Sequence, residues 1–566
     1  MADPRPWLEH YPPGVPREVD LDAFPSIVAM FEQACARHSQ RPAYSSFGTT
    51  LSWAELDRQS ACFAAFLANE WKLGKGDRLA IMLPNLLQYP IAMFGALRAG
   101  LTVVNVNPLY TARELQHQLE DSGARSIVVL ENFAATLQEA IGRTHVEHVI
   151  VTSIGDQLGF PKGPLISFAV KHVKKMVPRW SLPGHLCFGD VLRRGGGMQA
   201  PKIQLGHDDI AFLQYTGGTT GVAKGAMLTH GNMVANALQL AAWVGELFTR
   251  GEERIVTALP LYHIFSLTVN ALFMMYFGGE NILITNPRDI PAFIKTLKKN
   301  RWSAITGVNT LYNVLLHHPD FSSLDFSHVK FALAGGMAVQ RAVAERWKKA
   351  TGIPLIEGYG LTETSPVVTA NPLTIKEYTG SIGMPLPSTD ISLRDDEGRV
   401  APAGEAGELC VRGPQVMKGY WNRPEETAKV MDVDGWLRTG DIARMDDNGM
   451  FRIVDRKKDM ILVSGFNVYP NEIEDVVARH PGVLEVAAIG VPDEHSGEVV
   501  KLFVVKKDPA LTEAALKQYC HDELTGYKRP KYIEFRNELP KSNVGKILRR
   551  ALRDEEKQKA AGRQQS

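Results

Sequence analysis

The chain has 566 residues, a length at which two or more packed units are the usual arrangement. Its 45% hydrophobic and 22% charged content is ordinary for a globular protein, and a formal net charge of +1 provides no overall field that would attract nucleic acid. Five scattered cysteines form no C-x-x-C pair, so we expect reduced thiols in a cytoplasmic protein rather than disulfides or a zinc site. No apolar stretch approaches the roughly 18 residues that a membrane-spanning helix needs.

Short runs rich in β-branched residues alternate with helical patterns through most of the chain. The runs that predict strands are, in chain order, Leu79–Leu83, Thr102–Val106, Ser126–Leu130, His148–Thr152, Ile255–Leu259, Asn281–Thr285 and Phe331–Ala334. Amphipathic stretches such as Thr111–Ser122 and Ala342–Ala350 lie between them and predict helices. This alternation indicates an α/β fold of layered, largely parallel sheets, and the glycine- and proline-rich stretch Gly380–Gly419 predicts a small β-rich subdomain.

Five consecutive charged residues, Asp455–Asp459, follow a strand-like run and predict a hinge. We therefore expect a large N-terminal domain over residues 1–454, a hinge over 455–459 and a small, mobile α+β domain over 460–566. The elements predicted for the second domain are a helix over Asn471–His480, strands over Leu484–Val491 and Val499–Lys507, a helix over Leu511–Glu523 and a strand over Tyr532–Arg536. The polar last residues, Asp554–Ser566, are predicted to fray.

The segment Leu165–Val177 has an apolar helical face opposite a basic one. Lys171, Lys174 and Lys175 form the basic side. A helix of this kind can lie on an anionic membrane surface. The commoner arrangement is an ordinary surface helix packed on the core, and the sequence leaves both interpretations open.

The stretch Tyr215–Met227, YTGGTTGVAKGAM, follows the apolar run Ile210–Leu213. Glycine lets the backbone approach phosphate oxygens, threonine hydroxyls donate hydrogen bonds, and lysine supplies positive charge. The candidate phosphate-binding residues are Thr216, Gly217, Gly218, Thr219, Thr220, Gly221 and Lys224. The order Lys224-Gly225 excludes the phosphate loop of kinases and GTPases, which ends in Gly-Lys-Ser/Thr. A solvated linker is the alternative, which the strand-like run before the loop makes less attractive.

Four further motifs follow this loop in order. They are Gly358–Thr364 (GYGLTET), Gly435–Asp441 (GWLRTGD), Asp455–Asp459 (DRKKD) and Leu539–Ile547 (LPKSNVGKI). Together with the loop they resemble the signature of the adenylate-forming superfamily, which includes acyl-CoA synthetases, luciferases and the adenylation domains of peptide synthetases. The resemblance extends over nearly the whole chain, so we expect the fold and chemistry of that superfamily.

The resemblance implies a role for each motif. The nucleotide-binding residues that it implies, besides the phosphate loop, are Gly358, Tyr359, Gly360, Thr362, Asp441, Arg456 and Lys546. The Tyr359 ring offers a stacking face to adenine, the Thr362 hydroxyl can bind a phosphate, and the Glu363 carboxylate can hold Mg²⁺. Asp441 and Arg456 correspond to residues that bind the ribose hydroxyls. The expected catalytic residues are Lys546, Glu363 and Thr216.

The segment "DGWLRTGDIARMDDNGMFRIVDRKKD" resembles the signature of the fatty acyl-CoA synthetases. That resemblance implies a two-step reaction with ATP and coenzyme A as co-substrates and Mg²⁺ as cofactor. A long-chain fatty carboxylate attacks the α-phosphate of ATP to give an acyl-adenylate and pyrophosphate, and the thiol of coenzyme A then expels AMP. The enzyme has to position reactants and stabilise charge, and it needs no side-chain nucleophile.

The acyl and coenzyme A sites are assigned by the same resemblance. The residues expected to line the acyl tunnel and the adenylate are His263, Gly307, Val308, Gly335 and Gly336. His263 can equally be a packed core histidine, because a lone histidine in an apolar run is more often structural. Ser464 and Gly465 are expected to meet coenzyme A after the C-terminal domain has rotated about the hinge.

Several alternatives remain at this point. Within the superfamily, a CoA ligase for medium-chain or aromatic acids is the main one. A phosphotransferase that uses the same loop, and a non-catalytic acyl-binding protein built on this fold, are alternatives of other classes. We expect a cytoplasmic protein in peripheral contact with the inner membrane and without a nucleic-acid partner, and we leave a homodimer open.

Overall fold

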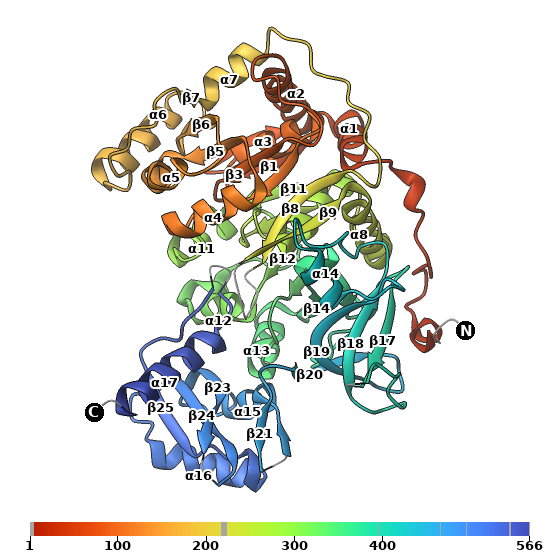
Figure 1. The fold of residues 1–566 in the computed structure, drawn as a ribbon, viewed down its shortest axis with the longest axis vertical. Coiled ribbons are helices and arrows are strands. Elements are labelled where there is room, and N and C mark those ends of the chain that lie inside the picture. Colours follow the sequence, from red (N-terminus) through yellow and green to blue (C-terminus); the bar gives the residue numbers. More distant parts are fainter. Residues whose placement is uncertain are drawn as a thin grey trace.

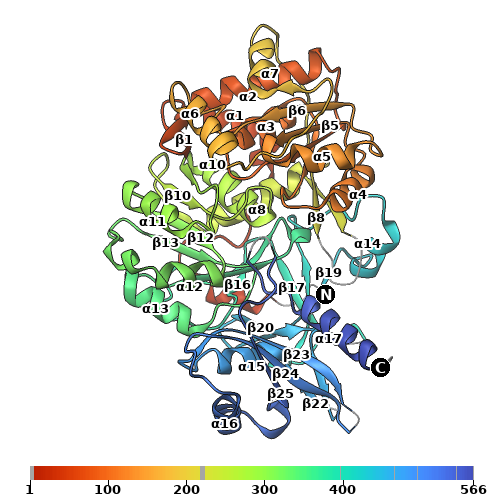
Figure 2. The same ribbon diagram turned by 90° about the vertical axis from the view of Figure 1, so that its left-hand side faces the viewer.

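The computed structural model describes residues 5–216, 223–395, 397–464, 466–493, 495–542 and 545–564. Four sheets organise the chain: a seven-stranded and a nine-stranded sheet in the N-terminal part, a four-stranded sheet after them, and a five-stranded sheet near the C-terminus (Figure 1). The C-terminal unit lies at one end of the molecule in both perpendicular views (Figure 2). None of the helices in the described part of the chain combines the length and the apolar character needed to cross a bilayer.

The seven-stranded sheet carries the predicted phosphate loop at its edge. Its order is β7-β6-β5-β3-β4-β8-β9, with bounds β3 Arg78–Met82, β4 Thr102–Asn105, β5 Ser126–Leu130, β6 His148–Thr152, β7 Leu186–Cys187, β8 Ile210–Thr216 and β9 Lys224–Thr229. The strands from β7 to β8 run parallel, whereas β9 is antiparallel to β8. Its covering helices are α2 Trp53–Asn69, α3 Gln88–Arg98, α4 Ala112–Ser122, α5 Ala134–Ile141 and α7 Phe188–Gly195.

Alternate residues of β3 enter different cores. Leu79 and Ile81 pack in the core that includes α2 and α3, whereas Ala80 and Met82 pack in the core that includes α4 and α5. Successive side chains of a strand point to opposite faces, so helices must cover both faces of a sheet whose strands are apolar throughout. The β-branched runs in the sequence therefore predict this layered arrangement correctly.

The nine-stranded sheet has the order β16-β15-β14-β13-β12-β10-β11-β1-β2. Its bounds are β1 Pro42–Ser46, β2 Thr49–Ser52, β10 Arg254–Thr257, β11 Glu280–Leu283, β12 Ala304–Gly307, β13 Phe331–Ala334, β14 Ile356–Gly360, β15 Val367–Ala370 and β16 Met384–Pro385. The accompanying helices are α1 Ile27–His38, α8 His230–Val244, α9 Ile264–Ser266, α10 Phe273–Phe277, α11 Ile290–Lys299, α12 Asn309–His317 and α13 Arg341–Thr351. Strands β12, β13 and β14 are parallel neighbours, so their carboxyl ends lie at one edge of the sheet. In open α/β sheets this edge is where ligands bind.

The four-stranded antiparallel sheet is the small β-rich subdomain. It consists of β17 Asp390–Arg394, β18 Gly407–Arg412, β19 Leu437–Met445 and β20 Phe451–Arg456, with α14 Pro424–Val430 between β18 and β19. The prediction placed this subdomain over Gly380–Gly419. The sheet extends further along the chain, as far as Arg456. Its last two strands, β19 and β20, carry the two motifs that were expected to bind ribose.

The C-terminal unit is an α+β module. Its elements are β21 Ile461–Val463, β22 Phe466–Val468, α15 Pro470–Val477, β23 Val483–Asp493, β24 Gly497–Lys506, α16 Glu513–Glu523, β25 Tyr532–Arg536 and α17 Arg549–Gln564. These elements and the layered sheets confirm the predicted fold class. The bounds of the two domains and of the hinge stay a prediction.

The expectation of a frayed end at Asp554–Ser566 is wrong for residues 554–564, because α17 extends to Gln564, and the last two residues lie outside the described ranges. Leu552 is fully buried and anchors the helix in the small core next to β23 and β24. Glu555 pairs with Arg536 at 2.6 Å and Glu556 pairs with Lys501 at 2.8 Å. Charged residues that appear to be a solvated tail in the sequence thus hold the helix on the module.

The basic segment near residue 170 is helical but is not packed on the core in the ordinary way. Helix α6 Lys162–Phe168 continues into a π-helical turn, η4 Ala169–Val173. Leu165, Phe168 and Val173 are more exposed than buried. The more common of the two interpretations, a surface helix that buries its apolar face, is therefore wrong.

Candidate active site

The predicted phosphate loop connects the adjacent ends of two antiparallel strands. Thr216, the last residue of β8, pairs with Lys224, the first residue of β9. Gly217, Gly218, Thr219, Thr220 and Gly221 lie outside the described residues. The Lys224 Nζ lies 2.6 Å from a carboxylate oxygen of Glu426 and 4.7 Å from the centroid of the Tyr420 ring. The two ends of the loop are thus fixed by the hairpin and by a charged contact from α14.

Three residues, each from a different motif, meet in a second group. The Tyr359 hydroxyl, at the end of β14, donates a hydrogen bond of 2.6 Å to Asp441 Oδ2. The Arg456 Nε lies 3.2 Å from Asp441 Oδ1, because Asp441 in β19 and Arg456 in β20 are direct partners in the antiparallel register. Burial and, after it, the Asp441 carboxylate raise the pKa of Tyr359 well above its ordinary value. The structure therefore brings the expected adenine and ribose residues into one cluster.

Gly360 permits the sharp path of this motif. A Cβ atom placed on Gly360 would come within 1.9 Å of the Pro366 carbonyl oxygen, so no side chain can be accommodated there. The close approach folds the segment after β14 back on itself and presents the short helix η8 Thr362–Thr364. Thr362 begins that helix, and Gly358 lies between β13 and β15 in the sheet.

Glu363 is the candidate ligand for a divalent cation. Its Oε1 accepts a hydrogen bond of 2.7 Å from the Tyr420 hydroxyl, and η8 packs against both β8 and β9. Mg²⁺ in nucleotide sites is commonly held by one or two carboxylates together with phosphate oxygens and water. A half-buried carboxylate that is oriented beside the ends of the phosphate loop fits this requirement. The described residues contain no cluster of three or more His, Cys, Asp or Glu side chains that would form a metal cage.

The loop that carries Lys546 docks on the N-terminal part of the protein. The Thr310 hydroxyl, at the start of α12, donates a hydrogen bond of 3.1 Å to the Gly545 carbonyl. Gly545 has a φ of +81°, a left-handed conformation that glycine adopts without strain. Within the loop, the Lys546 N–H donates to the Ser542 hydroxyl at 3.1 Å.

The ionisation behaviour of Lys546 places it in the same cluster. Burial and, after it, the Arg456 cation lower the pKa of Lys546 to about 7, against the opposing effect of Asp441. Burial and the charge of Lys546 lower the pKa of His263 to about 4, so His263 is neutral near pH 7. Lys546, Arg456, Asp441 and His263 therefore share one electrostatic environment, although Lys546 belongs to a different sheet system.

The residues expected to wall the substrate lie at the carboxyl ends of neighbouring parallel strands. Gly307 ends β12, Val308 precedes α12, and Gly335 follows β13. A Cβ on Gly335 would approach both the Phe265 ring and the Gly358 carbonyl to 3.1 Å, so these segments are in contact. Gly336 lies next to Val308. The histidine, His263, caps α9 and accepts a hydrogen bond from the Phe265 N–H at 3.3 Å.

Of the two residues expected to bind coenzyme A, Ser464 is described, and it makes no contact with this cluster in the described part of the chain. Ser464 lies at the end of β21, where its N–H donates to the Ser496 carbonyl at 2.8 Å. Gly465 lies outside the described residues. No contact in the described ranges joins Ser464 to Lys546, and the assignment of both residues stays a prediction.

Two residues of the site were missed in the sequence. Tyr420 and Glu426 lie in the stretch Gly419–Thr427, which carried no expected function. They contact Glu363 and Lys224, from which they are separated by 57 and 202 positions in the chain. An acidic pair directly after a proline, Glu425-Glu426, was the only local signal, and it is typical of any helix start.

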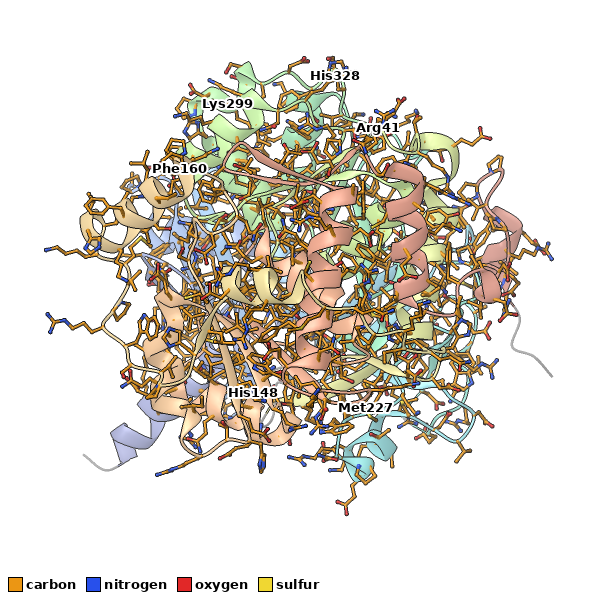
Figure 3. The ribbon with its side chains drawn as sticks, turned by 90° about the horizontal axis from the view of Figure 1, so that it is seen from above. Arg41, His148, Phe160, Met227, Lys299 and His328 are labelled. Atoms are coloured by element: carbon orange, nitrogen blue, oxygen red, sulfur yellow. The ribbon has the colours of Figure 1, made fainter. Side chains whose placement is uncertain are left out.

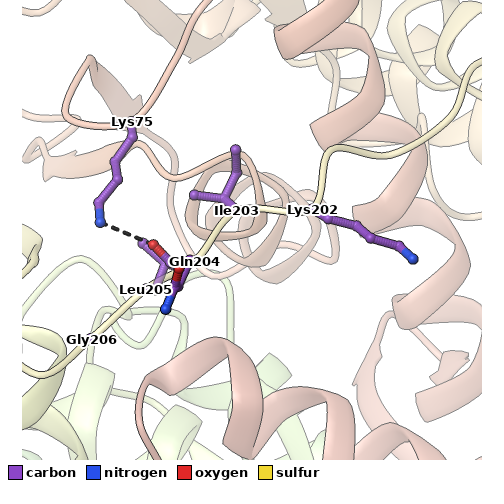
Figure 4. A pocket seen from close by; sticks show the side chains of 6 residues that line it. All are labelled: Lys75, Lys202, Ile203, Gln204, Leu205 and Gly206. Carbon is purple, nitrogen blue, oxygen red and sulfur yellow. Dashed lines mark hydrogen bonds between the residues drawn. The ribbon is translucent and has the colours of Figure 1, made fainter.

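A surface hollow of about 560 Å³ lies elsewhere (Figure 4). It is lined by Lys75, Lys202, Ile203, Gln204, Leu205 and Gly206, and the Lys75 Nζ donates to the Gln204 carbonyl at 2.9 Å. None of these residues belongs to the cluster around Asp441. The hollow is thus separate from the candidate active site.

Two family models cover most of the chain. The model described as AMP-binding enzyme matches residues 31–421, and the model described as AMP-binding enzyme C-terminal domain matches residues 472–546. The chain belongs to the AMP-binding enzyme family, which confirms the resemblance to the adenylate-forming superfamily.

Similar proteins narrow the class. A long-chain-fatty-acid–CoA ligase of Escherichia coli O6:H1 is 59% identical over 549 residues, which cover 97% of this chain and 98% of the relative. The ligase of the same name from Bacillus subtilis is 41% identical, with 98% and 99% of the two chains covered. Among solved structures, an anthranilate CoA ligase in complex with anthranoyl-AMP matches with a TM-score of 0.85 at 26% identity, covering 96% of this chain and 100% of that one.

Proposed function

We propose that the protein is an ATP-dependent long-chain fatty acid–CoA ligase that forms an acyl-adenylate and then an acyl-CoA. The observation that carries the proposal is the contact of Tyr359 and Arg456 with Asp441, together with the docking of the Lys546 loop on α12 through Thr310. The substrate class follows from the relatives at 56–59% identity over nearly the full chain, all named long-chain-fatty-acid–CoA ligase.

The first half-reaction brings two anions together, the fatty carboxylate and ATP. Lys546 supplies a positive charge where these anions meet, and the docked loop fixes its position. Its pKa of about 7 means that a substantial fraction is neutral near pH 7 without nucleotide. A bound triphosphate favours the charged form and raises that pKa, so the lysine acquires its full charge when ATP is in place.

Glu363 is the residue that would hold Mg²⁺, and the Tyr420 hydroxyl keeps its carboxylate in one orientation. A bound Mg²⁺ neutralises charge on phosphate oxygens and makes pyrophosphate a better leaving group. Thr216 and Lys224, at the two ends of the loop, are suited to bind the β- and γ-phosphates. Asp441 accepts hydrogen bonds from the ribose hydroxyls, and Arg456 keeps it oriented.

The second half-reaction requires Lys546 to withdraw and coenzyme A to enter, with Ser464 and Gly465 as the expected contacts. We assign the rotation to the hinge 455–459. Asp455 and Asp459 both lie 3.4 Å from Arg549, which also pairs with Glu474 of α15 at 2.7 Å. Burial raises the pKa of Asp455 to about 6, against the effect of Arg549. This network supports the hinge in the orientation described here.

The decisive test is the analysis of products over a panel of acids. We expect coenzyme A-dependent release of AMP and pyrophosphate with acids of roughly six to eighteen carbons, and preference for the longer ones because each buried CH₂ contributes about 0.8 kcal/mol. Release of ADP would indicate a phosphotransferase. Binding of acyl groups without AMP release would indicate a non-catalytic protein.

A ligase for medium-chain or aromatic acids is the second candidate. It is favoured by the feruloyl-CoA synthase of Amycolatopsis, which is 35% identical over 89% of this chain and 94% of its own, and by the fold of the anthranilate CoA ligase. Anthranilate and ferulate therefore belong in the panel. A higher kcat/KM for these acids than for long-chain acids would favour this candidate.

We also propose that the protein associates peripherally with the cytoplasmic face of the inner membrane through one surface. Phe160, Leu165, Phe168, Val173 and Met176 form the 160–176 patch, and their exposed fractions lie between 54% and 92%. Phe160 lies at the margin of the molecule (Figure 3). An exposed apolar group flanked by lysines is typical of helices that lie in an anionic membrane interface.

Vesicle sedimentation tests this surface. Reversal of charge at Lys171, Lys174 and Lys175 should reduce binding to anionic vesicles at least about a hundredfold, since each cation near the surface contributes about 1 kcal/mol. The matched control is reversal of Lys295, Lys298 and Lys299 on α11, which do not belong to the patch. Equal binding by both variants contradicts the proposed contact. A homodimer stays a prediction.

A further inference from the structure

Tyr420 contacts both charged groups that the proposed function assigns to the triphosphate. Its hydroxyl donates to Glu363 Oε1 at 2.7 Å, and the Lys224 ammonium lies over its ring at 4.7 Å from the centroid. Only 7% of the Tyr420 surface is exposed. A phenol offers a hydroxyl at its edge and a negative face on the ring, so one side chain can orient an anion and a cation at the same time.

The backbone around Tyr420 is attached to both of the elements concerned. The Trp421 N–H donates to the Gly225 carbonyl at 2.8 Å, and the Met227 N–H donates to the Gly419 carbonyl at 2.9 Å. The Met417 N–H donates to the Glu363 carbonyl at 2.8 Å. The segment 417–421 thus bridges β9, which begins with Lys224, and η8, which carries Glu363.

Helix α14 completes the arrangement. The Tyr420 N–H donates to the Thr427 hydroxyl at 2.9 Å, which fixes the start of the helix to the tyrosine. Glu426 of the same helix pairs with Lys224 at 2.6 Å and also with Lys429. Lys224 is therefore held between a carboxylate and an aromatic face, and a triphosphate meets a lysine whose position is already fixed.

We propose that Tyr420 is a positioning residue for the triphosphate end of the site: its hydroxyl orients the Glu363 carboxylate towards the metal–phosphate complex, and its ring face orients Lys224 towards the phosphates. The inference rests on the proposed function, since it requires that ATP binds at the β8–β9 hairpin. It adds a division within one side chain. The hydroxyl acts on the metal site through Glu363, and the ring acts on the phosphates through Lys224.

The test separates the two parts by substitution in the full-length protein. Tyr420→Phe removes the hydroxyl and keeps the ring, whereas Tyr420→Leu removes both. ATP binding is titrated calorimetrically in EDTA and then over a series of Mg²⁺ concentrations, so the readout does not depend on turnover. Tyr11→Phe is the matched control, because the Tyr11 hydroxyl also makes one hydrogen bond. Its acceptor is the Pro385 carbonyl in β16, which belongs to the nine-stranded sheet and not to the sheet that contains the β8–β9 hairpin.

We expect Tyr420→Phe to raise the Mg²⁺ concentration for half-maximal enhancement of ATP binding about tenfold, as loss of a charge-assisted hydrogen bond implies. Metal-free ATP binding should stay within about twofold of the parent, while Tyr420→Leu should weaken it about threefold. In a Glu363→Gln background, Tyr420→Phe should have no further effect on the Mg²⁺ dependence.

Other outcomes overturn the inference. An unchanged Mg²⁺ dependence in Tyr420→Phe contradicts the orientation of Glu363, and equal losses with and without Mg²⁺ indicate a general structural role. If the parent protein releases AMP and the Mg²⁺ dependence of ATP binding is the same in Tyr420→Phe as in Tyr11→Phe, the inference is refuted and the proposed function is not. A parent protein that binds no ATP refutes the proposed function as well. Tyr420→Phe keeps the buried ring, so the test does not depend on whether Tyr420→Leu folds.

Discussion

The two ends of the candidate nucleotide site are built differently. The triphosphate end, with Lys224, Glu363 and Tyr420, is made of residues from the two large sheets and the segment between β18 and β19. The ribose end, with Asp441 and Arg456, is completed by Lys546, which comes from the C-terminal module. In the proposed rotation, the triphosphate end is permanent, whereas the ribose end includes Lys546 only while the module is docked.

The proposed rotation would divide the half-reactions between the two ends. Interactions at the permanent end serve ATP in every orientation of the module, so their loss should weaken ATP binding itself. Interactions of the docked loop serve only the step in which the loop is present, so their loss should affect acyl-adenylate formation and spare thioester formation. Substitutions at the two ends test that distinction.

The largest effect is expected for Lys546→Ala. Loss of the charge where carboxylate and α-phosphate meet should lower the rate of adenylate formation about a thousandfold. Thioester formation from supplied acyl-AMP should change less than about threefold, because in the proposed rotation the lysine has left the site before that step. Single-turnover assays of the two half-reactions measure both rates.

Lys541→Ala is the matched control for that experiment. Lys541 lies in the same loop but pairs with Glu485 on the module itself, at 2.6 Å. Its loss should leave both half-reactions nearly unchanged. Comparable losses of both half-reactions in Lys546→Ala would contradict the assignment of this lysine to the first step.

The second prediction concerns Asp441, which is permanent but lies next to the docked lysine. Asp441→Asn keeps the size of the side chain and removes the charge that pairs with Arg456. Loss of charge-assisted hydrogen bonds should weaken ATP binding about tenfold to a hundredfold and affect both half-reactions, because AMP is held in each. Calorimetric titration with ATP and with AMP measures the loss, and a selective effect on adenylate formation would contradict it.

Much of this arrangement was accessible from the sequence. The strands β3 to β6 follow apolar β-branched runs closely, because a strand covered on both faces needs apolar residues at every position. The motifs at Tyr359, Asp441 and Lys546 were predicted to bind nucleotide; the structure joins Tyr359 to Asp441 by a hydrogen bond, and the Asp441 carboxylate acts on the pKa of Lys546. What they share is a local signal, a short motif or run that specifies its own conformation.

The remainder depends on contacts that no local pattern encodes. Tyr420 and Glu426 acquire their importance only from partners on other elements. The end of the chain appeared to be a solvated tail because the ion pairs of α17 join residues of different elements. The segment Leu165–Val177 was correctly recognised as amphipathic, but periodicity does not determine whether an apolar face is covered.

A smaller effect is expected at the docking contact itself. Thr310→Val removes the hydroxyl that donates to the Gly545 carbonyl and keeps the branched shape of the side chain. Adenylate formation should slow about threefold to tenfold, as the loss of one hydrogen bond implies, while thioester formation stays the same. Thr296→Val is the control, because its hydroxyl donates within α11 to the Ala292 carbonyl at 2.9 Å. Equal rates in the two variants would contradict the role of Thr310 in docking.

The smallest expected effect is the uptake of a proton when ATP binds. Lys546 has a pKa lowered to about 7 by burial and by Arg456, with Arg549 and Lys458 as further cations nearby and Asp441 opposing them. At pH 8 the free protein therefore holds this lysine mostly neutral, and a bound triphosphate raises its pKa and draws a proton from solvent. Calorimetry of ATP binding in two buffers of different ionisation enthalpy should detect an uptake approaching one proton per ATP. Burial lowers the pKa of Lys458 to about 8, so Lys458 also titrates in this range, and the uptake that disappears in Lys546→Ala isolates the share of Lys546. An identical uptake in parent and variant would mean that the docked lysine is already charged before ATP binds. The charge at the ribose end would then not depend on ATP, as is expected of the triphosphate end.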